Sequence, residues 1–136
     1  MSVVEELLRT EANGKLSFGN HELQEKKKVE DFESMGDVYK VKTFAEITKL
    51  EKNGMFLYES VPGTSVFDFE ETAEGMSFLA KGAHATQITV GLKEDTEYEV
   101  FMKGASIGVV KTNLSGKLNL SVDLKLEDVD VKIAEV

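Results

Sequence analysis

The sequence predicts an all-β protein, a single antiparallel β-sandwich of about ten short strands joined by glycine turns. The runs 97–102 and 117–124 alternate apolar and polar residues, as strands with one buried face do. Turn signals recur at roughly the 8–12-residue spacing that is typical of sandwiches and barrels. No helix-length apolar period separates the strands, which argues against a parallel α/β sheet.

The length and charge of the chain exclude several classes of protein. A chain of 136 residues is expected to form one domain, 1–136, and it has no cysteine for disulfides or Cys-based metal sites. Its 25 acidic and 16 basic residues give a net charge of −9, and Arg9 is the only arginine. We therefore expect no nucleic-acid partner and no membrane partner. No signal-peptide pattern and no apolar run of ~20 residues is present, so we expect a cytoplasmic protein.

The N-terminal residues predict a β-hairpin over 3–18. Asn13-Gly14 lies between two short runs, and this dipeptide is the strongest short-range hairpin signal. The apolar spacing of 3–9 also fits a short helix, and that alternative stays open. Residues 1–20 can also serve as an arm that exchanges between copies of the chain.

The next strands are predicted from lysines and turn residues. Residues 21–36 are interpreted as a solvated or edge strand because Lys26–Lys28 would discourage unwanted pairing at an edge. A strand over 38–44 follows. Asn53-Gly54 then predicts a hairpin over 46–60, with a helix over 44–51 as the alternative.

The second half of the chain is expected to contain strands throughout. Val61–Thr64 has the Pro and Gly positions of a type II turn. A hairpin over 65–80 turns at Glu74-Gly75, with Phe67 and Phe69 on one face. Further strands are predicted at 87–92, three times within 96–124, and at 129–133.

The histidines and serines are the candidates for a metal site or a nucleophile. His21 and His84 lie in predicted turns beside small or polar residues, and we expect both to be exposed. Neither has a metal-ligand spacing, so no metal and no cofactor is expected. Gly104–Gly108 reads GASIG and matches the G-x-S-x-G spacing, but the helix that follows a nucleophilic serine in this motif is not expected there, and we identify no catalytic residue.

Acidic residues cluster in one hairpin and near the C-terminus. These residues are Asp68, Glu70 and Glu71, and then Asp123, Glu127, Asp128 and Asp130. Paired carboxylates about 5–10 Å apart hydrolyse glycosides, and Ca²⁺ takes six or more oxygens. The alternative, which the abundance of acids favours, is a solvated strand face with its turns.

Tyrosines are the aromatic candidates for ligand binding, because the chain has no tryptophan and an aromatic ring with a polar group suits sugar recognition. Tyr39 and Tyr58 are the predicted ligand-binding residues. Tyr98 alternates with Val100 and is expected in the core.

Nearly the whole chain resembles a family of short proteins from anaerobic Gram-positive gut bacteria that often carry the label endosialidase. The resemblance is carried by five segments: Leu16–Asn20, Tyr39–Phe44, Glu46–Gly54, Tyr58–Thr64 and Lys111–Lys117. It implies cleavage of sialic acid polymers. The C-terminal third also resembles the β-sandwich modules of polysaccharide-degrading enzymes, which implies binding or packing.

The leading hypothesis is therefore a non-catalytic interaction module that binds carbohydrate. The first alternative is a self-assembling structural protein, an oligomer or filament that uses residues 1–20 or edge strands. The second is the glycosidase that the family label implies. A homo-oligomer and a glycan partner are expected.

Overall fold

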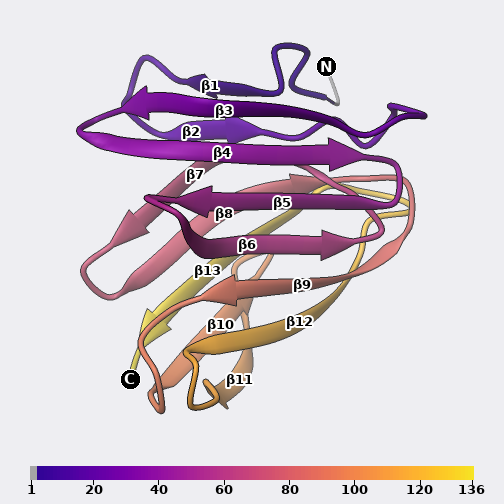
Figure 1. The fold of residues 1–136 in the computed structure, drawn as a ribbon. Helices are drawn as coiled ribbons and strands as arrows, with labels where there is room; N and C mark the ends of the chain where they lie inside the picture. The colour runs from indigo at the N-terminus through magenta and orange to yellow at the C-terminus, as the bar shows by residue number, and fades with distance from the viewer. Residues whose placement is uncertain (1–2) are drawn as a thin grey trace.

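Two antiparallel sheets pack face to face in the computed structural model, which confirms the predicted β-sandwich (Figure 1). The structure describes residues 3–136, so the first two residues of the predicted 1–20 arm lie outside the described part. This part contains thirteen strands, against the expected number of about ten. It contains no helix, and hence none that could cross a membrane.

Sheet A has seven strands, and it lies behind the other sheet in Figure 1. In spatial order they are β1 (Leu8–Thr10), β2 (Leu16–Phe18), β7 (Ser65–Thr72), β8 (Gly75–Lys81), β13 (Val129–Glu135), β10 (Glu97–Met102) and β11 (Ala105–Lys111). The predicted N-terminal hairpin is the pair β1–β2, and β2 continues the sheet through β7.

Sheet B has six strands. In spatial order they are β12 (Lys117–Asp123), β9 (Ala85–Gly91), β6 (Met55–Val61), β5 (Ile47–Lys52), β4 (Asp37–Phe44) and β3 (Lys27–Ser34). β3 is an edge strand, as its lysines predict. The three strands predicted within 96–124 divide between the sheets, because β10 pairs with β11 whereas β12 pairs with β9.

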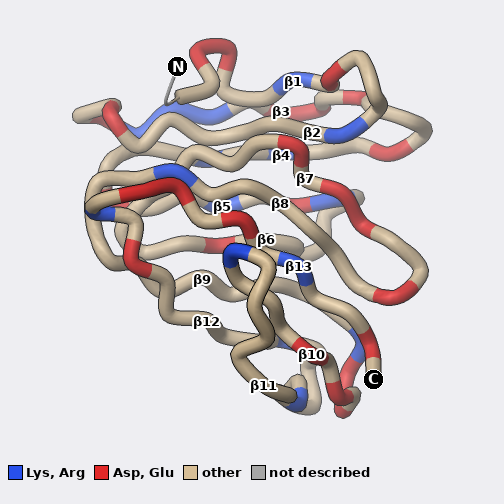
Figure 2. Tube along the Cα trace, turned by 180° about the vertical axis from the view of Figure 1, so that it is seen from behind, with Lys and Arg blue, Asp and Glu red and all other residues tan. Residues whose placement is uncertain are grey.

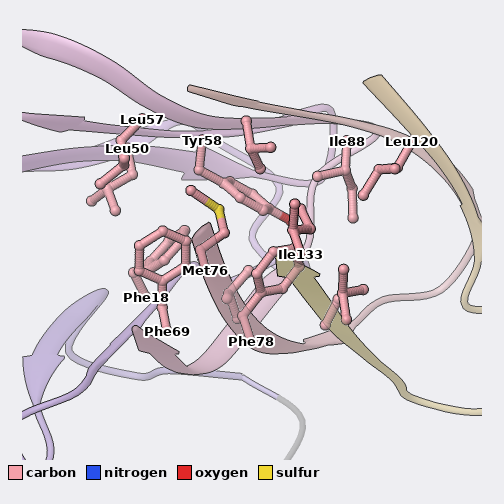
Figure 3. Packing of buried hydrophobic residues seen from close by; sticks show 14 of the residues in the cluster. Phe18, Leu50, Leu57, Tyr58, Phe69, Met76, Phe78, Ile88, Leu120 and Ile133 are labelled. Carbon is pink, nitrogen blue, oxygen red and sulfur yellow. The ribbon is translucent and has the colours of Figure 1, made fainter. Parts of the chain in front are cut away.

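The core lies between the sheets and follows the predicted alternation. On β12, Leu118, Leu120 and Val122 are buried and their neighbours are exposed. Four aromatic rings make its centre: Phe18, Tyr58, Phe69 and Phe78 (Figure 3). Tyr58 meets Phe18 edge-to-face at 5.2 Å and Phe78 at 5.5 Å between ring centroids, a geometry that aromatic quadrupoles favour.

Both helical alternatives are wrong. Residues 5–6 form a turn and Leu7 has a φ of 73°, so no helix forms over 3–9. Residues 47–52 are β5, paired on both sides by β4 and β6. Asn53-Gly54 makes the predicted hairpin turn, with both residues at positive φ.

Two predicted turns differ in detail. The prediction of a type II turn at Val61–Thr64 is wrong: Gly63 lacks the positive φ that this turn requires, and the Val61–Pro62 peptide bond is cis. The turn of the β7–β8 hairpin is 73–74, so Gly75 already belongs to β8.

Phe67 and Phe69 lie on opposite faces of sheet A, so the predicted shared face is wrong. The register of β7 against β8 shifts between Phe67 and Glu70, and Asp68 has a φ of 54°. This bulge inserts an extra residue and reverses the alternation. Phe69 therefore enters the core, while the ring of Phe67 lies outside, 4.8 Å from Lys81 Nζ.

Candidate functional site

A half-open groove lies where β4 and β5 of sheet B face the β2–β7 end of sheet A. Its volume is about 300 Å³. The turn between β1 and β2 and the turn between β3 and β4 form its rim. The polar side chains that line it include Asn13, Lys15, Asp37, Tyr39, Lys52, Glu70 and Glu71.

Tyr39 lines this groove with most of its ring buried, at an exposed fraction of 8%. Its hydroxyl has no hydrogen-bond partner within residues 3–136. Burial raises the pKa of the Tyr39 phenol, and the nearby Lys52 ammonium opposes that rise. The phenol is thus a neutral donor and acceptor at the groove, whereas its ring is too buried to serve as a stacking surface.

Lys52 is the central cation of the groove. Its Nζ lies 2.7 Å from Glu71 Oε1 and 3.7 Å from Asp37 Oδ2. The hydrogen bond to Glu71 raises the pKa of Lys52. A second pair, Lys15 with Glu70, lies at 3.6 Å. The groove therefore offers ammonium donors and carboxylate acceptors in nearly equal number.

Tyr58, the second predicted ligand-binding residue, lies in the core with no exposed surface (Figure 3). Its hydroxyl lies 2.8 Å from Thr64 Oγ1, and Ser60 Oγ lies at the same distance from that atom. Burial raises the pKa of the Tyr58 phenol far above its ordinary value. A ligand at the surface cannot contact Tyr58, so Tyr39 alone of the two adjoins a groove.

Thr64 belongs to a buried hydroxyl network beside the 61–64 turn. Thr48 Oγ1 donates to the Thr64 carbonyl at 2.8 Å and accepts from the Thr64 amide at 3.1 Å. Gly63 makes close packing possible here, because a Cβ on it would lie 2.1 Å from the Phe44 carbonyl oxygen. All these hydroxyls have partners, so the network explains rigidity and not ligand binding.

His84 is exposed, as expected, whereas His21 is half-buried. His21 Nδ1 lies 2.8 Å from Ser65 Oγ, and burial lowers the pKa of His21. Ser65 is fully buried, so this serine–histidine contact has no access to a substrate. Within residues 3–136, no three His, Asp or Glu side chains are grouped to hold a metal ion.

The two acidic clusters have different surroundings. Glu70 and Glu71 reach the groove, whereas Asp68 occupies the β7 bulge. Three of the four C-terminal acids pair with separate lysines: Asp123 with Lys125, Glu127 with Lys103 and Asp128 with Lys81. This second cluster is a solvated surface.

The sequence did not identify Lys15 and Lys52 as site residues. Each is one lysine among many, and both stand beside an Asn-Gly turn. That proximity to a turn was the available signal, but it does not say which hairpin ends meet across the sandwich.

Comparisons with known proteins give no relative. No protein-family model matches the chain, and no curated protein and no solved structure matches it significantly.

Proposed function

We propose that the chain is a non-catalytic interaction module whose groove beside Tyr39 binds a hydroxyl-rich ligand of the carbohydrate class. The observation that carries the proposal is the juxtaposition, in one groove, of the unbonded Tyr39 hydroxyl and the Lys52 ammonium. Sugar hydroxyls both donate and accept, and this groove supplies both kinds of partner.

The size and charge of the groove support a short, uncharged ligand. A volume of about 300 Å³ is at the lower end of small-molecule sites, which span about 300–1,000 Å³. Its lysines are already paired with carboxylates: Lys52 with Glu71 of the opposite sheet and Asp37 of the neighbouring strand β4, and Lys15 with Glu70 on β7. An added anion would compete with those carboxylates, whereas a neutral polyol adds hydrogen bonds without a charge conflict. The resemblance to carbohydrate-active modules favours the same ligand class.

A glycan screen followed by calorimetry tests the proposal. Tyr39→Phe removes only the hydroxyl and is expected to weaken binding about 5- to 10-fold, the worth of one hydrogen bond. The matched control is Tyr98→Phe, whose hydroxyl accepts a hydrogen bond from the Lys93 amide at 3.1 Å, outside the groove. This control should leave affinity unchanged.

Two outcomes would contradict the proposal. Equal loss in both tyrosine variants, or binding that ignores Tyr39→Phe, would remove the groove as the site. Release of free sugar in the same screen would assign Glu70 and Glu71 a catalytic role, as the glycosidase alternative requires.

A further inference from the structure

The strand β12 is a regular sheet edge, unlike the other three edges of the sandwich. β1 has only three residues. β3 and β11 each contain a register shift against their neighbours, and Asp31 in β3 has a φ of 56°. Short and bulged edges resist pairing with another chain. β12 instead pairs with β9 over seven consecutive residues without a shift.

The backbone of β12 offers hydrogen-bonding groups on its free side. The Gly116 carbonyl accepts from the Leu92 amide, and the Leu124 amide donates to the His84 carbonyl. The backbone N–H and C=O groups of the even-numbered residues therefore point toward β9. Because these groups alternate in an antiparallel ladder, those of Asn119 and Ser121 point toward the open edge.

We propose that β12 pairs with β12 of a second copy of this chain, antiparallel about a two-fold axis at Leu120. This register places Asn119 opposite Ser121 of the second copy, so the open backbone groups satisfy one another. It also places Lys117 opposite Asp123 of the second copy, and the symmetry repeats both contacts. Lys117 and Asp123 are the only charges on β12, and both are exposed. Figure 2 shows the trace of β9 and β12 almost free of other charges.

The residues that flank β12 support the same register. Leu114 is 81% exposed and Leu126 is 97% exposed, which makes them the two most exposed large apolar residues of the described chain. Leu114 precedes Lys117 by three residues, and Leu126 follows Asp123 by three. With the axis at Leu120, Leu114 lies beyond the same end of the paired strands as Leu126 of the second copy, and the symmetry repeats this at the other end. Burial of these side chains would favour association.

Neighbouring registers lack this complementarity. A slip of two residues in one direction sets Lys117 opposite Lys125 of the second copy, and like charges directly opposite each other destabilise a sheet. A slip in the other direction sets Lys117 opposite Ser121 and Asp123 opposite Ser115, with no ion pair. The charge pattern thus selects one antiparallel register and one partner, the chain itself.

This inference does not rest on the proposed ligand groove. The groove adjoins β4 and β5, toward the β3 edge of sheet B, and β12 forms the opposite edge. Loss of dimerisation and loss of glycan binding can therefore be measured separately.

Sedimentation equilibrium of the full chain measures the dimer dissociation constant. Variants that reverse the charges of Lys117 and Asp123 test the pairing. Wild type is expected to dimerise. Lys117→Asp and Asp123→Lys each set like charges opposite each other twice and should raise the dimer dissociation constant about tenfold or more. The double variant Lys117→Asp/Asp123→Lys restores opposite charges and should recover the dimer.

The matched control is Lys27→Asp, a charge reversal on the edge strand β3, which should leave the dimer unchanged. Thermal unfolding of each variant shows whether it folds; this matters for Lys117→Asp, because Lys117 Nζ also lies 4.6 Å above the Phe56 ring. A wild-type monomer up to about 1 mM, or folded single variants that dimerise like wild type, would overturn the proposal. Failure of the folded double variant to recover the dimer would overturn the assigned register.

Discussion

Lys52 Nζ and Glu71 Oε1 lie 2.7 Å apart and join the two sheets across the groove, with Lys52 on β5 and Glu71 on β7. Both side chains are about one-third exposed, at 30% and 35%. Tyr39 and Lys52 are cross-strand partners on β4 and β5, so this contact holds the ammonium beside Tyr39. Its chief effect is therefore expected on the ligand and not on stability.

Replacement of Lys52 by methionine separates these two effects. Lys52→Met should lower the free energy of unfolding by less than about 1 kcal/mol, because a partly exposed ion pair contributes little. It should weaken glycan binding more than that, since an ammonium donor is lost from the groove. Urea unfolding and calorimetry measure the two quantities. A double-mutant cycle with Glu71→Gln gives the coupling; a coupling above about 2 kcal/mol would contradict the exposed-pair interpretation.

Tyr58→Phe tests the buried hydroxyl network. The variant removes the hydrogen bond between the Tyr58 and Thr64 hydroxyls and keeps the one between Thr64 and Ser60. It should lower the free energy of unfolding by about 1–2 kcal/mol at neutral pH. Burial raises the Tyr58 pKa above its ordinary value of 10.0, so the contribution of Tyr58 to wild-type stability should be constant below that pH and fall above it, as the unfolded chain ionises first. Tyr58→Phe should show a shallower alkaline fall. The free energy of unfolding of both proteins is measured by urea unfolding between pH 9 and pH 11. An equal fall with pH in the two proteins would refute the assignment of this loss to Tyr58.

Phe67 and Phe69 provide a matched pair for the β7 bulge. Phe69→Ala removes a core ring that packs against Phe18 at 5.5 Å and Phe78 at 5.8 Å between ring centroids, and should cost about 3–5 kcal/mol. Phe67→Ala removes a ring on the outer face and should cost about 1 kcal/mol, including its contact with Lys81. Similar losses in chemical denaturation would mean that both rings enter the core.

Gly63→Ala tests the close approach at the 61–64 turn. The added Cβ would meet the Phe44 carbonyl oxygen at 2.1 Å, so the backbone must shift. We expect the free energy of unfolding to fall by at least about 2 kcal/mol. The control is Gly82→Ala, which meets the end of the Leu124 side chain at 3.1 Å and should be mild. A small loss at Gly63, measured as a midpoint shift in thermal unfolding, would contradict the tight packing of this turn.

The architecture was largely predictable because strand alternation and Asn-Gly turns are local signals. Asn53-Gly54 defines its hairpin within the chain, and the pattern of β12 identifies its buried face before any neighbour is known. The bulge at Asp68 was not predictable, because nothing local marks a single extra residue in a strand. It reversed the expected position of Phe67.

The candidate site was less predictable, since it depends on contacts between distant segments. Tyr39 and Tyr58 occur in similar strand-like surroundings, yet one adjoins a groove and the other fills the core. The groove itself joins residues near positions 15, 39, 52 and 70 from both sheets. Only the stacking of the sheets brings these residues together.

The bulges on β3 and β11 have a consequence for behaviour at high concentration. In a cross-β fibril each strand pairs with a neighbouring chain on both sides. The bulged strands β3 and β11 do not offer a regular edge for such pairing. The pairing proposed for β12 would occupy the one long, regular edge strand among residues 3–136. The measured mass is therefore expected to saturate as concentration rises, and added fibril seeds should fail to recruit the folded chain.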